Sequence, residues 1–302
     1  MPTPLHHPLR DPLNPMRIMR PLRTALYLPA NRASAVAKAR MADCDAVILD
    51  LEDAVAPEAK DQARSDAVAA VTEGGFGDRL LVIRINALDS AWGPDDCAAL
   101  SDARPDAVLL PKIASAADIA DARALLPAGL PIWAMLETCA AFLDLGAIAR
   151  DGRQNGLAAF VLGTNDLALE MRCTLDTQRS ALLPLLTQAV VAARAHGLIV
   201  LDGVFNDIAD AEGLASQCAQ GAALGFDGKT IIHPAQLAPA NAAFGPTPAQ
   251  IEQAGAIVAA FSAAENAGKG VIRLDGKMVE LLHLRQAEQT LAIHRAITAR
   301  AG

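Results

Sequence analysis

The chain has 302 residues and a formal net charge of -8, with 52% hydrophobic and only 3% aromatic residues. This length and apolar content suit one large domain with an extensive core of helices packed on strands. The acidic balance disfavours a general binder of nucleic acids or of anionic membranes. No apolar run approaches the roughly 18 residues of a membrane span, so we expect no membrane partner.

The first residues and the cysteines indicate where the protein resides. Residues 1–22 contain six prolines and several arginines but lack the apolar core of a secretory signal, so we expect a disordered tail. An organelle presequence is the alternative, although frequent prolines would interrupt its amphipathic helix. The five cysteines are scattered without a CxxC pair, and an odd number is a poor basis for a disulfide framework. We therefore expect reduced thiols in a cytoplasmic protein.

From residue 24 the sequence alternates short apolar runs with longer Ala-rich amphipathic segments. Eight runs have the length of strands: 24–28, 46–50, 80–85, 107–110, 132–136, 158–162, 198–201 and 228–232. Segments of helix length lie between them, including 33–42, 57–71, 116–126 and 179–195. Continuous apolar strands separated by helices indicate parallel strands buried on both faces. Eight such units in about 210 residues predict an α/β protein with a closed (β/α)8 TIM barrel over residues 23–245, and an open doubly wound sheet is the alternative.

The last part of the chain, residues 246–302, is expected to form a helical extension. Its pattern predicts a helix over 246–267, a turn at 268–270, a short segment over 271–274 and a final helix over 278–298. Such an extension could close the mouth of the barrel and exclude water from it.

Polar residues follow the ends of the expected strands, and parallel strands bring these ends to one rim. Glu137 and Asp166 each come after an apolar run of strand length. Neither can serve the core, because an unpaired charge there would be costly to desolvate. Two carboxylates at the ends of consecutive strands therefore predict a divalent-metal site. Other polar residues after the strands are Asn31, Asp50, Glu52, Asp53, Arg84, Asn86, Lys112, Thr138, Asn165, Asp202 and His233.

Helix capping is the alternative explanation for this set, because loops that lead into helices favour Asp, Asn and Gly. Thr138 and Asn165 fit as caps. Arg84, Lys112 and Glu137 are poor caps, so capping does not explain the whole set. The sequence therefore predicts an active site where acidic, basic and amide groups converge on the rim.

Several of these residues lie in motifs that resemble a known family. The motifs are Leu49-Asp-Leu-Glu-Asp-Ala-Val55, Val82-Ile-Arg-Ile-Asn86, Leu110-Pro-Lys112, Leu136-Glu-Thr138, Gly163-Thr-Asn-Asp-Leu167 and Gly225-Phe-Asp-Gly-Lys-Thr-Ile-Ile-His-Pro234. In this order they resemble the citrate lyase β-subunit family, the CoA-ester lyase branch of the HpcH/HpaI aldolase superfamily. That branch includes malyl-CoA and citramalyl-CoA lyases. The resemblance runs from about residue 23 to about residue 296.

The resemblance implies a Mg²⁺-dependent barrel enzyme that acts on CoA thioesters. Glu137 and Asp166 would be the direct metal ligands, because Mg²⁺ prefers oxygen donors and takes only one or two carboxylates. Asp50, Glu52 and Asp53 would hold water around the metal. A solvated acidic turn, with Asp53 capping the next helix, is the alternative for these three residues.

Arg84 matches the family arginine that holds the substrate beside the metal. Its guanidinium would fork onto a carboxylate and stabilise the oxyanion that appears as a bond breaks. A structural ion pair with the Asp50 cluster is the alternative, and both roles could coexist. Lys112 would support substrate binding electrostatically or form a structural ion pair.

The general base and the CoA-binding residues come from the resemblance alone. The base would be Glu280, which ends the stretch Asp275-Gly-Lys-Met-Val-Glu280 where the family has an aspartate, and Asp275 is the alternative. Ala30 replaces the family's usual glycine in the first loop, which would be strained if that position required a positive φ. The residues expected to meet the CoA phosphates are Arg23, Arg32 and Lys38.

We therefore expect a Mg²⁺-dependent acyl-CoA carbon–carbon lyase of the malyl-CoA or citramalyl-CoA type. Retro-Claisen cleavage would give an acyl-CoA and a 2-oxo acid. The alternatives are a malyl-CoA thioesterase, a citrate lyase β subunit that acts on a carrier-bound citryl group, and a non-catalytic assembly partner. The resemblance also suggests a homo-oligomer, either a trimer or a pair of trimers.

Overall fold

The computed structural model describes residues 21–301 and divides into two compact units, which are treated one at a time. The first unit spans Leu22–Phe244, and the second begins at Gly245. The expected tail over residues 1–22 lies outside the described residues except for its last two positions. Within residues 21–301, no helix combines the length and the apolar character needed to cross a membrane.

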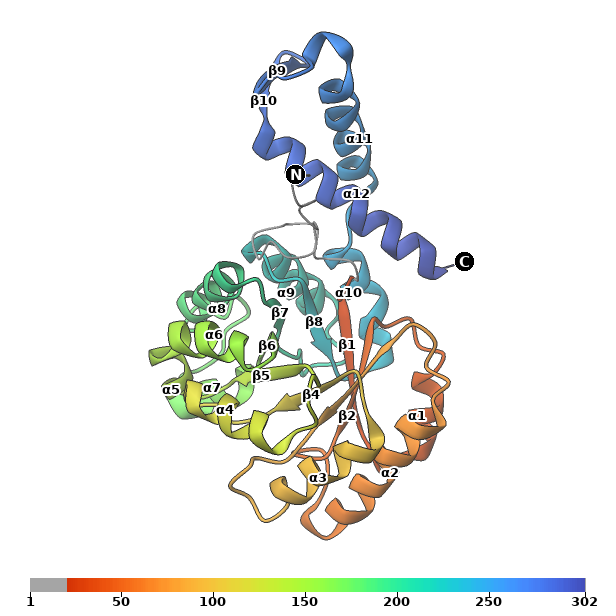
Figure 1. Ribbon diagram of the computed structural model, residues 1–302, viewed down its shortest axis with the longest axis vertical. Helices are drawn as coiled ribbons and strands as arrows, with labels where there is room; N and C mark the ends of the chain where they lie inside the picture. The colour runs from red at the N-terminus through yellow and green to blue at the C-terminus, as the bar shows by residue number, and fades with distance from the viewer. Residues whose placement is uncertain (1–20, 302) are drawn as a thin grey trace, which may run out of the picture. The chain divides into compact units, whose positions relative to one another are not determined.

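The first unit is a closed barrel of eight parallel strands (Figure 1). Its strands are β1 (Thr24–Pro29), β2 (Ala46–Asp50), β3 (Leu80–Arg84), β4 (Ala107–Leu110), β5 (Ile132–Leu136), β6 (Leu157–Leu162), β7 (Ile199–Asp202) and β8 (Gly228–Ile231). The first and last strands pair in parallel, with Leu26 opposite Ile231, so the sheet has no free edge. This closure confirms the predicted barrel and excludes an open doubly wound sheet.

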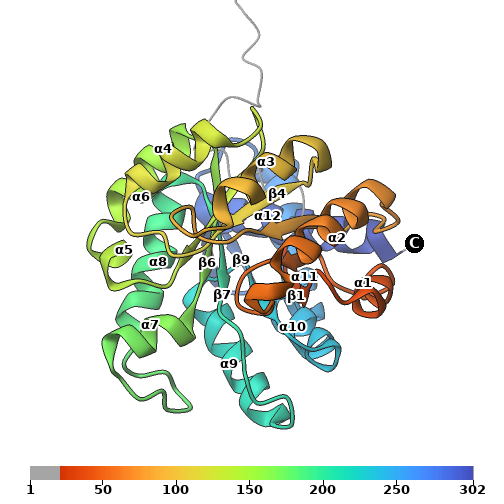
Figure 2. The same cartoon turned by 90° about the horizontal axis from the view of Figure 1, so that it is seen from below.

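Helices connect successive strands and surround them (Figure 2). They are α1 (Ala33–Ala39), η2 (Pro57–Ala59), α2 (Lys60–Glu73), α3 (Gly93–Ala103), α4 (Ala116–Leu125), α5 (Cys139–Leu143), α6 (Leu145–Gln154), α7 (Thr164–Met171), α8 (Leu183–His196), α9 (Ala211–Leu224), η3 (Pro234–Gln236) and α10 (Leu237–Phe244). The predicted helix over 179–195 begins later, because Pro184 lacks an N–H and is tolerated only in the first turn. It ends where Gly197 adopts a left-handed conformation with φ of 64°.

Side chains alternate along each strand between the barrel interior and the surrounding helices. Residues such as Ala46, Ile48, Val82 and Trp133 form one buried cluster inside the barrel, while their neighbours pack in a second, larger cluster under the helices. Continuing the interior series by two residues at a time leads to four polar side chains near the carboxyl ends of the strands. These are Tyr27, Asp50, Arg84 and Glu137. The period of two therefore directs them to one mouth.

The second unit contains two helices and a β-hairpin. Its elements are α11 (Pro248–Ser262), η4 (Ala264–Asn266), β9 (Val271–Leu274), β10 (Lys277–Glu280) and α12 (Leu281–Ala301). The predicted start of the last helix at residue 278 is wrong, because residues 277–280 pair antiparallel with β9. Asp275 and Gly276, with φ of 51° and 78°, form the two-residue turn of this hairpin. Ile257, Ile272 and Val279 belong to a small core of this unit.

Candidate active site

Arg84 lies at the centre of the barrel mouth and contacts three acidic side chains. Its Nε donates to Asp50 Oδ1 and its Nη2 to Asp50 Oδ2, both at 2.6 Å. Its Nη1 lies 2.7 Å from a Glu52 oxygen and 3.3 Å from an Asp53 oxygen. The ion pair that the sequence offered as an alternative for Arg84 is therefore present. Asp53 contacts Arg84 but is exposed, and the N-cap of the next helix is Ala56. Asp50 and Glu52 are buried, so these two residues do not form a solvated turn.

Glu52 is buried among charges of both signs. Burial raises the pKa of its carboxyl to about 7, and the carboxylates of Asp53 and Glu137 add to the rise, whereas Arg84 opposes it. Its Oε2 accepts no hydrogen bond from any of residues 21–301, although Arg84 is within ion-pair distance. The Glu52 carboxyl can therefore bind a proton or a water molecule near neutral pH.

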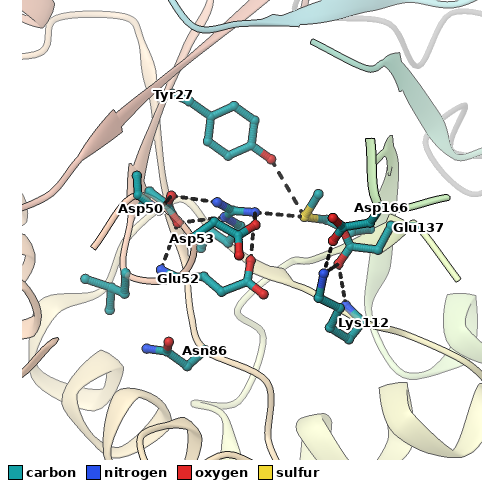
Figure 3. Close-up of polar contacts among 12 residues, drawn as sticks. Tyr27, Asp50, Glu52, Asp53, Asn86, Lys112, Glu137 and Asp166 are labelled. Atoms are coloured by element: carbon teal, nitrogen blue, oxygen red, sulfur yellow. Dashed lines mark hydrogen bonds and ion pairs between the residues drawn. The ribbon is translucent and has the colours of Figure 1, made fainter. Parts of the chain in front are cut away.

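Glu137 and Asp166 lie side by side on the opposite side of the mouth from Asp50 and Glu52, as Figure 3 shows. Both carboxylates pair with the ammonium of Lys112, which contacts Asp166 Oδ2 closely and lies 3.6 Å from Glu137 Oε1. The backbone N–H of Lys112 also donates to Glu137 Oε1 at 2.7 Å. The same small cation therefore reaches both carboxylates, as the predicted metal site requires.

A glycine makes room for the Glu137 carboxylate. A Cβ at Gly163 would lie 2.5 Å from Glu137 Oε2 and 2.4 Å from its Cβ, closer than side chains tolerate. Gly163 precedes α7, whose first turn carries Asp166, and acidic groups are favoured at that end of a helix. The loop after β6 thus brings its own carboxylate to Glu137 without a steric conflict.

The residues present fit a Mg²⁺ ion at Glu137 and Asp166. Two carboxylate ligands suit an ion that keeps several waters. Glu52 Oε2 is paired with Arg84 but accepts no hydrogen bond from residues 21–301, so it is a natural acceptor for such water. No group of three or more His, Cys, Asp or Glu side chains within residues 21–301 is arranged to hold a metal. This donor set suits Mg²⁺ better than Zn²⁺, which takes three or four protein ligands.

A buried lysine that the sequence analysis overlooked anchors the acidic loop. Lys60 donates to the carbonyl oxygens of Leu51 and Glu52 at 2.9 and 2.8 Å and to Asn86 Oδ1 at 2.6 Å. Asn86 in turn donates to Asp96. Because Asn86 follows β3, this ammonium ties the loop after β2 to the strand that carries Arg84. Lys60 follows the motif Leu49–Val55 by five residues, and nothing in this spacing indicated that it would be buried.

Two expected helix caps have different outcomes. The Thr138 hydroxyl accepts a hydrogen bond from the Ala141 N–H at 3.1 Å, which confirms it as the N-cap of α5. Asn165 is not a cap, because it lies inside α7 and its amide group bonds to that of Asn206. Pairing across two loops at the mouth outweighs capping at this position.

The three basic residues expected to bind CoA phosphates do not lie together. Arg23 precedes the amino end of β1, where its guanidinium bonds to Asp45. Arg32 follows the carboxyl end of β1, and Lys38 is on α1, and both are exposed. Ala30 is not among the residues with positive φ, so it causes no strain there. Arg32 alone of the three directly follows the carboxyl end of β1, because Lys38 is in the last turn of α1.

Glu280 and Asp275 belong to the second unit. Glu280 is the last residue of β10, directly before α12, and its backbone N–H donates to His283 Nδ1. Asp275 lies in the hairpin turn, which gives it a structural role. Assignment of the base to Glu280 stays a prediction from the resemblance.

The structure is a closed (β/α)8 barrel. At its mouth, Asp50, Glu52 and Asp53 pair with Arg84, and Glu137 and Asp166 pair with the Lys112 ammonium. Residues 23–234 match the family model described as HpcH/HpaI aldolase/citrate lyase. The chain belongs to this family, which confirms the resemblance carried by its motifs.

Relatives of known activity cover nearly the whole chain. A (3S)-malyl-CoA thioesterase of Cereibacter sphaeroides is 46% identical over 279 residues, which cover 92% of this chain and 96% of that protein. The L-malyl-CoA/beta-methylmalyl-CoA lyase of the same species is 33% identical and covers 91% of this chain and 95% of that protein. Human mitochondrial citramalyl-CoA lyase is 31% identical, and the match covers 92% of this chain and 86% of that protein.

A solved relative shares the architecture. Protein CitE from Mycobacterium tuberculosis, in complex with magnesium, acetoacetate and coenzyme A, superposes with a TM-score of 0.75 at 29% identity. The match covers 92% of this chain and 99% of that chain. The barrel described here is therefore the fold of this family.

Proposed function

We propose that the protein hydrolyses the thioester of a 2-hydroxyacyl-CoA of the malyl-CoA type with the help of Mg²⁺. The observation that carries this proposal is the convergence of Glu137 and Asp166 on one cation, the Lys112 ammonium, in the same mouth as Arg84. Higher identity to (3S)-malyl-CoA thioesterase than to the lyases supports hydrolysis over carbon–carbon cleavage. The sequence analysis had placed the lyase first and the thioesterase second.

The acidic residues of the mouth hold cations, and the basic residues supply positive charge for the substrate. Mg²⁺, when held by Glu137 and Asp166, supplies positive charge that orients the hydroxyl and carboxylate oxygens of the acyl group. Lys112 adds a further positive charge beside these two carboxylates. Asp50 fixes the plane of the Arg84 guanidinium through two hydrogen bonds, so that Arg84 presents its charge in one orientation.

Glu52 is suited to take the proton of the attacking water. Its pKa of about 7 leaves a substantial fraction of the carboxylate ready to accept a proton near neutral pH. Water then adds to the thioester carbonyl carbon, the C–S bond breaks, and the proton that Glu52 took from water passes to the sulfur, so that CoA leaves as the thiol. We further propose that Arg32, which is exposed just after the carboxyl end of β1, contacts the CoA phosphates.

Carbon–carbon cleavage is the second candidate. Two relatives that cover more than nine tenths of this chain are acyl-CoA lyases, at 33% and 31% identity. The same carboxylates and Arg84 would hold the 2-hydroxy acid while a base, predicted to be Glu280, removes the hydroxyl proton. The products would be an acyl-CoA and a 2-oxo acid.

Product identification with (3S)-malyl-CoA and Mg²⁺ tests the proposal. Hydrolysis releases free CoA thiol together with intact malate, whereas lysis gives acetyl-CoA and glyoxylate. We expect thiol and malate. Acetyl-CoA with a 2-oxo acid would make the protein a lyase, and absence of turnover on malyl-CoA and citramalyl-CoA would support an assembly partner or an enzyme for carrier-bound substrates.

A further inference from the structure

Tyr27 places a hydroxyl group inside the barrel mouth. It is the only tyrosine of the chain, and it belongs to the interior series of β1 together with Ala25. With Asp50, Arg84, Glu137 and Asp166, it lines a cavity of about 310 Å³. The Arg84 guanidinium lies over its ring, 5.1 Å from the centroid. The Tyr27 phenol therefore lines the proposed active site.

The partner of this hydroxyl is a weak one. Tyr27 Oη donates to the sulfur of Met135 at 3.8 Å, as the dashed line in Figure 3 marks. A thioether is a poor acceptor compared with a carbonyl or an oxyanion. An oxygen atom of a bound substrate would therefore compete successfully for this donor.

Three other donors at the mouth already face strong acceptors. Each guanidinium nitrogen of Arg84 lies within 3.3 Å of a carboxylate oxygen. Lys112 pairs with the two predicted metal ligands, and the Thr230 hydroxyl donates to the carbonyl oxygen of Asp202. Compared with these three donors, the Tyr27 hydroxyl gives up a weaker hydrogen bond when it donates to a substrate.

Burial and the neighbouring charges keep the Tyr27 phenol protonated, so that it acts as a hydrogen-bond donor and not as a general base. Desolvation raises its pKa above the ordinary tyrosine value, and the carboxylates of Asp50 and Glu137 add to this rise against the effect of Arg84. The phenol therefore keeps its proton at every pH at which the protein would work. A neutral, fixed O–H is the kind of group that stabilises a developing negative charge.

We propose that Tyr27 is a catalytic residue whose hydroxyl donates a hydrogen bond to the thioester carbonyl oxygen of the bound acyl-CoA. The bond strengthens as water adds to the carbonyl carbon and the oxygen becomes an oxyanion, and it weakens again when the C–S bond breaks. Tyrosine keeps its proton throughout, and water supplies the proton that the CoA thiol receives. This inference rests on the proposed action on CoA thioesters.

The spacing along β5 supports the choice of the thioester oxygen. Met135, which bonds to the hydroxyl, lies two residues before Glu137 on the same face of the strand. At about 3.3 Å per residue this separation is about 7 Å, which a short acyl chain bonded at both ends can span. One end of the acyl group would then meet Glu137 and Asp166 while its thioester meets Tyr27.

The kinetic test compares Tyr27→Phe with Met135→Leu. We expect Tyr27→Phe to lower kcat about 100-fold, the usual effect of losing one oxyanion donor, with little change in KM. Met135→Leu removes the thioether but leaves the hydroxyl, so its loss should be much smaller. Equal losses in the two variants would mean that the hydroxyl serves only its bond to sulfur, and would overturn the proposal.

A binding test separates this inference from the proposed function. Two unreactive probes are used with Mg²⁺: a malyl-CoA analogue with CH₂ in place of the thioester sulfur, and a thioether analogue in which CH₂ replaces the carbonyl. Incorporated 3-fluorotyrosine gives a single ¹⁹F resonance at Tyr27, which should shift with the carbonyl probe and much less with the thioether probe. Tyr27→Phe should weaken binding of the carbonyl probe only.

Two outcomes count against the account, and they differ. If both probes bind wild type and Tyr27→Phe with unchanged affinity, Tyr27 does not contact the thioester oxygen, although the protein still binds CoA thioesters. If neither probe binds wild type while the ¹⁹F spectrum shows a folded protein, the proposed action on CoA thioesters is wrong. The proposed role of Tyr27 is then wrong as well.

Discussion

Glu52 carries a proton in the folded protein over a pH range in which an unfolded glutamate has lost it. Its pKa rises from 4.5 to about 7, chiefly because burial disfavours the charged form. Between these two values the folded state binds more protons than the unfolded state, so the free energy of unfolding falls as the pH rises. Above pH 7 the ionised Glu52 therefore lowers the free energy of unfolding, and such perturbed carboxyls are typical of functional sites.

Glu52→Gln should therefore make the protein more stable above pH 7 and change its stability little below pH 4.5. Urea denaturation at a series of pH values, in EDTA so that no divalent cation intervenes, measures this difference. Glu58→Gln is the matched control, because Glu58 is exposed on η2 and near the same loop. A pH dependence that is the same in wild type and Glu52→Gln would contradict the raised pKa.

The individual site residues were predictable to different degrees. Glu137, Asp166 and Arg84 stand out because a charge after an apolar strand has no place in a core. Tyr27 was missed, since an aromatic residue within an apolar strand looks like packing. The period of two along β1 was the signal that could have placed it in the mouth. Burial of Lys60 depends on tertiary contacts that local sequence does not encode.

The loop between β6 and α7 depends on the absence of a side chain at Gly163. Gly163→Ala should push the Glu137 carboxylate away, because the new Cβ would fall 2.5 Å from its Oε2. We expect Mg²⁺ affinity to drop about 10- to 100-fold, as it does when the support of a ligand is lost. Isothermal titration of Mg²⁺ measures the change.

Gly146→Ala is the matched control for this substitution. Gly146 is in α6, and nothing lies within 4 Å of the position of its Cβ. Alanine there should stabilise the helix by up to about 1 kcal/mol and leave Mg²⁺ affinity as in wild type. Equal Mg²⁺ affinities of Gly163→Ala and wild type would mean that Glu137 is not held by this close approach.

Elements were predicted more accurately in the barrel than in the second unit. Every barrel strand begins and ends within one residue of its predicted bounds, because each is a continuous apolar run between polar segments. The hairpin of β9 and β10 was missed, since its strands have only four residues each and each strand has a single buried residue, Ile272 and Val279. The Asp275-Gly276 pair was the available turn signal.

Closure of the barrel is reinforced where the strand pairing is shortest. Strands β7 and β8 pair through only two residue pairs, and the second is Asp202 with Lys229. Both side chains are fully buried, with their charged atoms 3.0 Å apart, and Arg179 lies 2.6 Å from Asp202. Burial alone would raise the pKa of Asp202, but Lys229 and Arg179 hold it below its usual value.

Lys229→Met should lower the free energy of unfolding by about 3 kcal/mol, because it leaves Asp202 with one cationic partner in a buried place. Urea denaturation of the whole chain measures the loss. Lys38→Met, at an exposed position of the same unit, should change stability by less than about 0.5 kcal/mol. Equal stability of Lys229→Met and wild type would mean that apolar packing replaces the ion pair without cost.

The assembly of the protein stays a prediction. A homotrimer or a pair of trimers is suggested by the family resemblance, and nothing in the sequence alone requires it. Light scattering coupled to size-exclusion chromatography determines the mass in solution, and about three or six times the chain mass of 31.4 kDa is expected. A mass equal to that of one chain would contradict this prediction.

The account as a whole depends on Glu137 and Asp166 holding one divalent cation, and Mn²⁺ binding followed by electron paramagnetic resonance measures this. Wild type should bind one Mn²⁺ per chain in competition with Mg²⁺. Glu137→Gln and Asp166→Asn should each lose most of that binding while circular dichroism stays unchanged. Binding of Mn²⁺ by either folded variant with the stoichiometry and affinity of wild type would contradict the shared cation site.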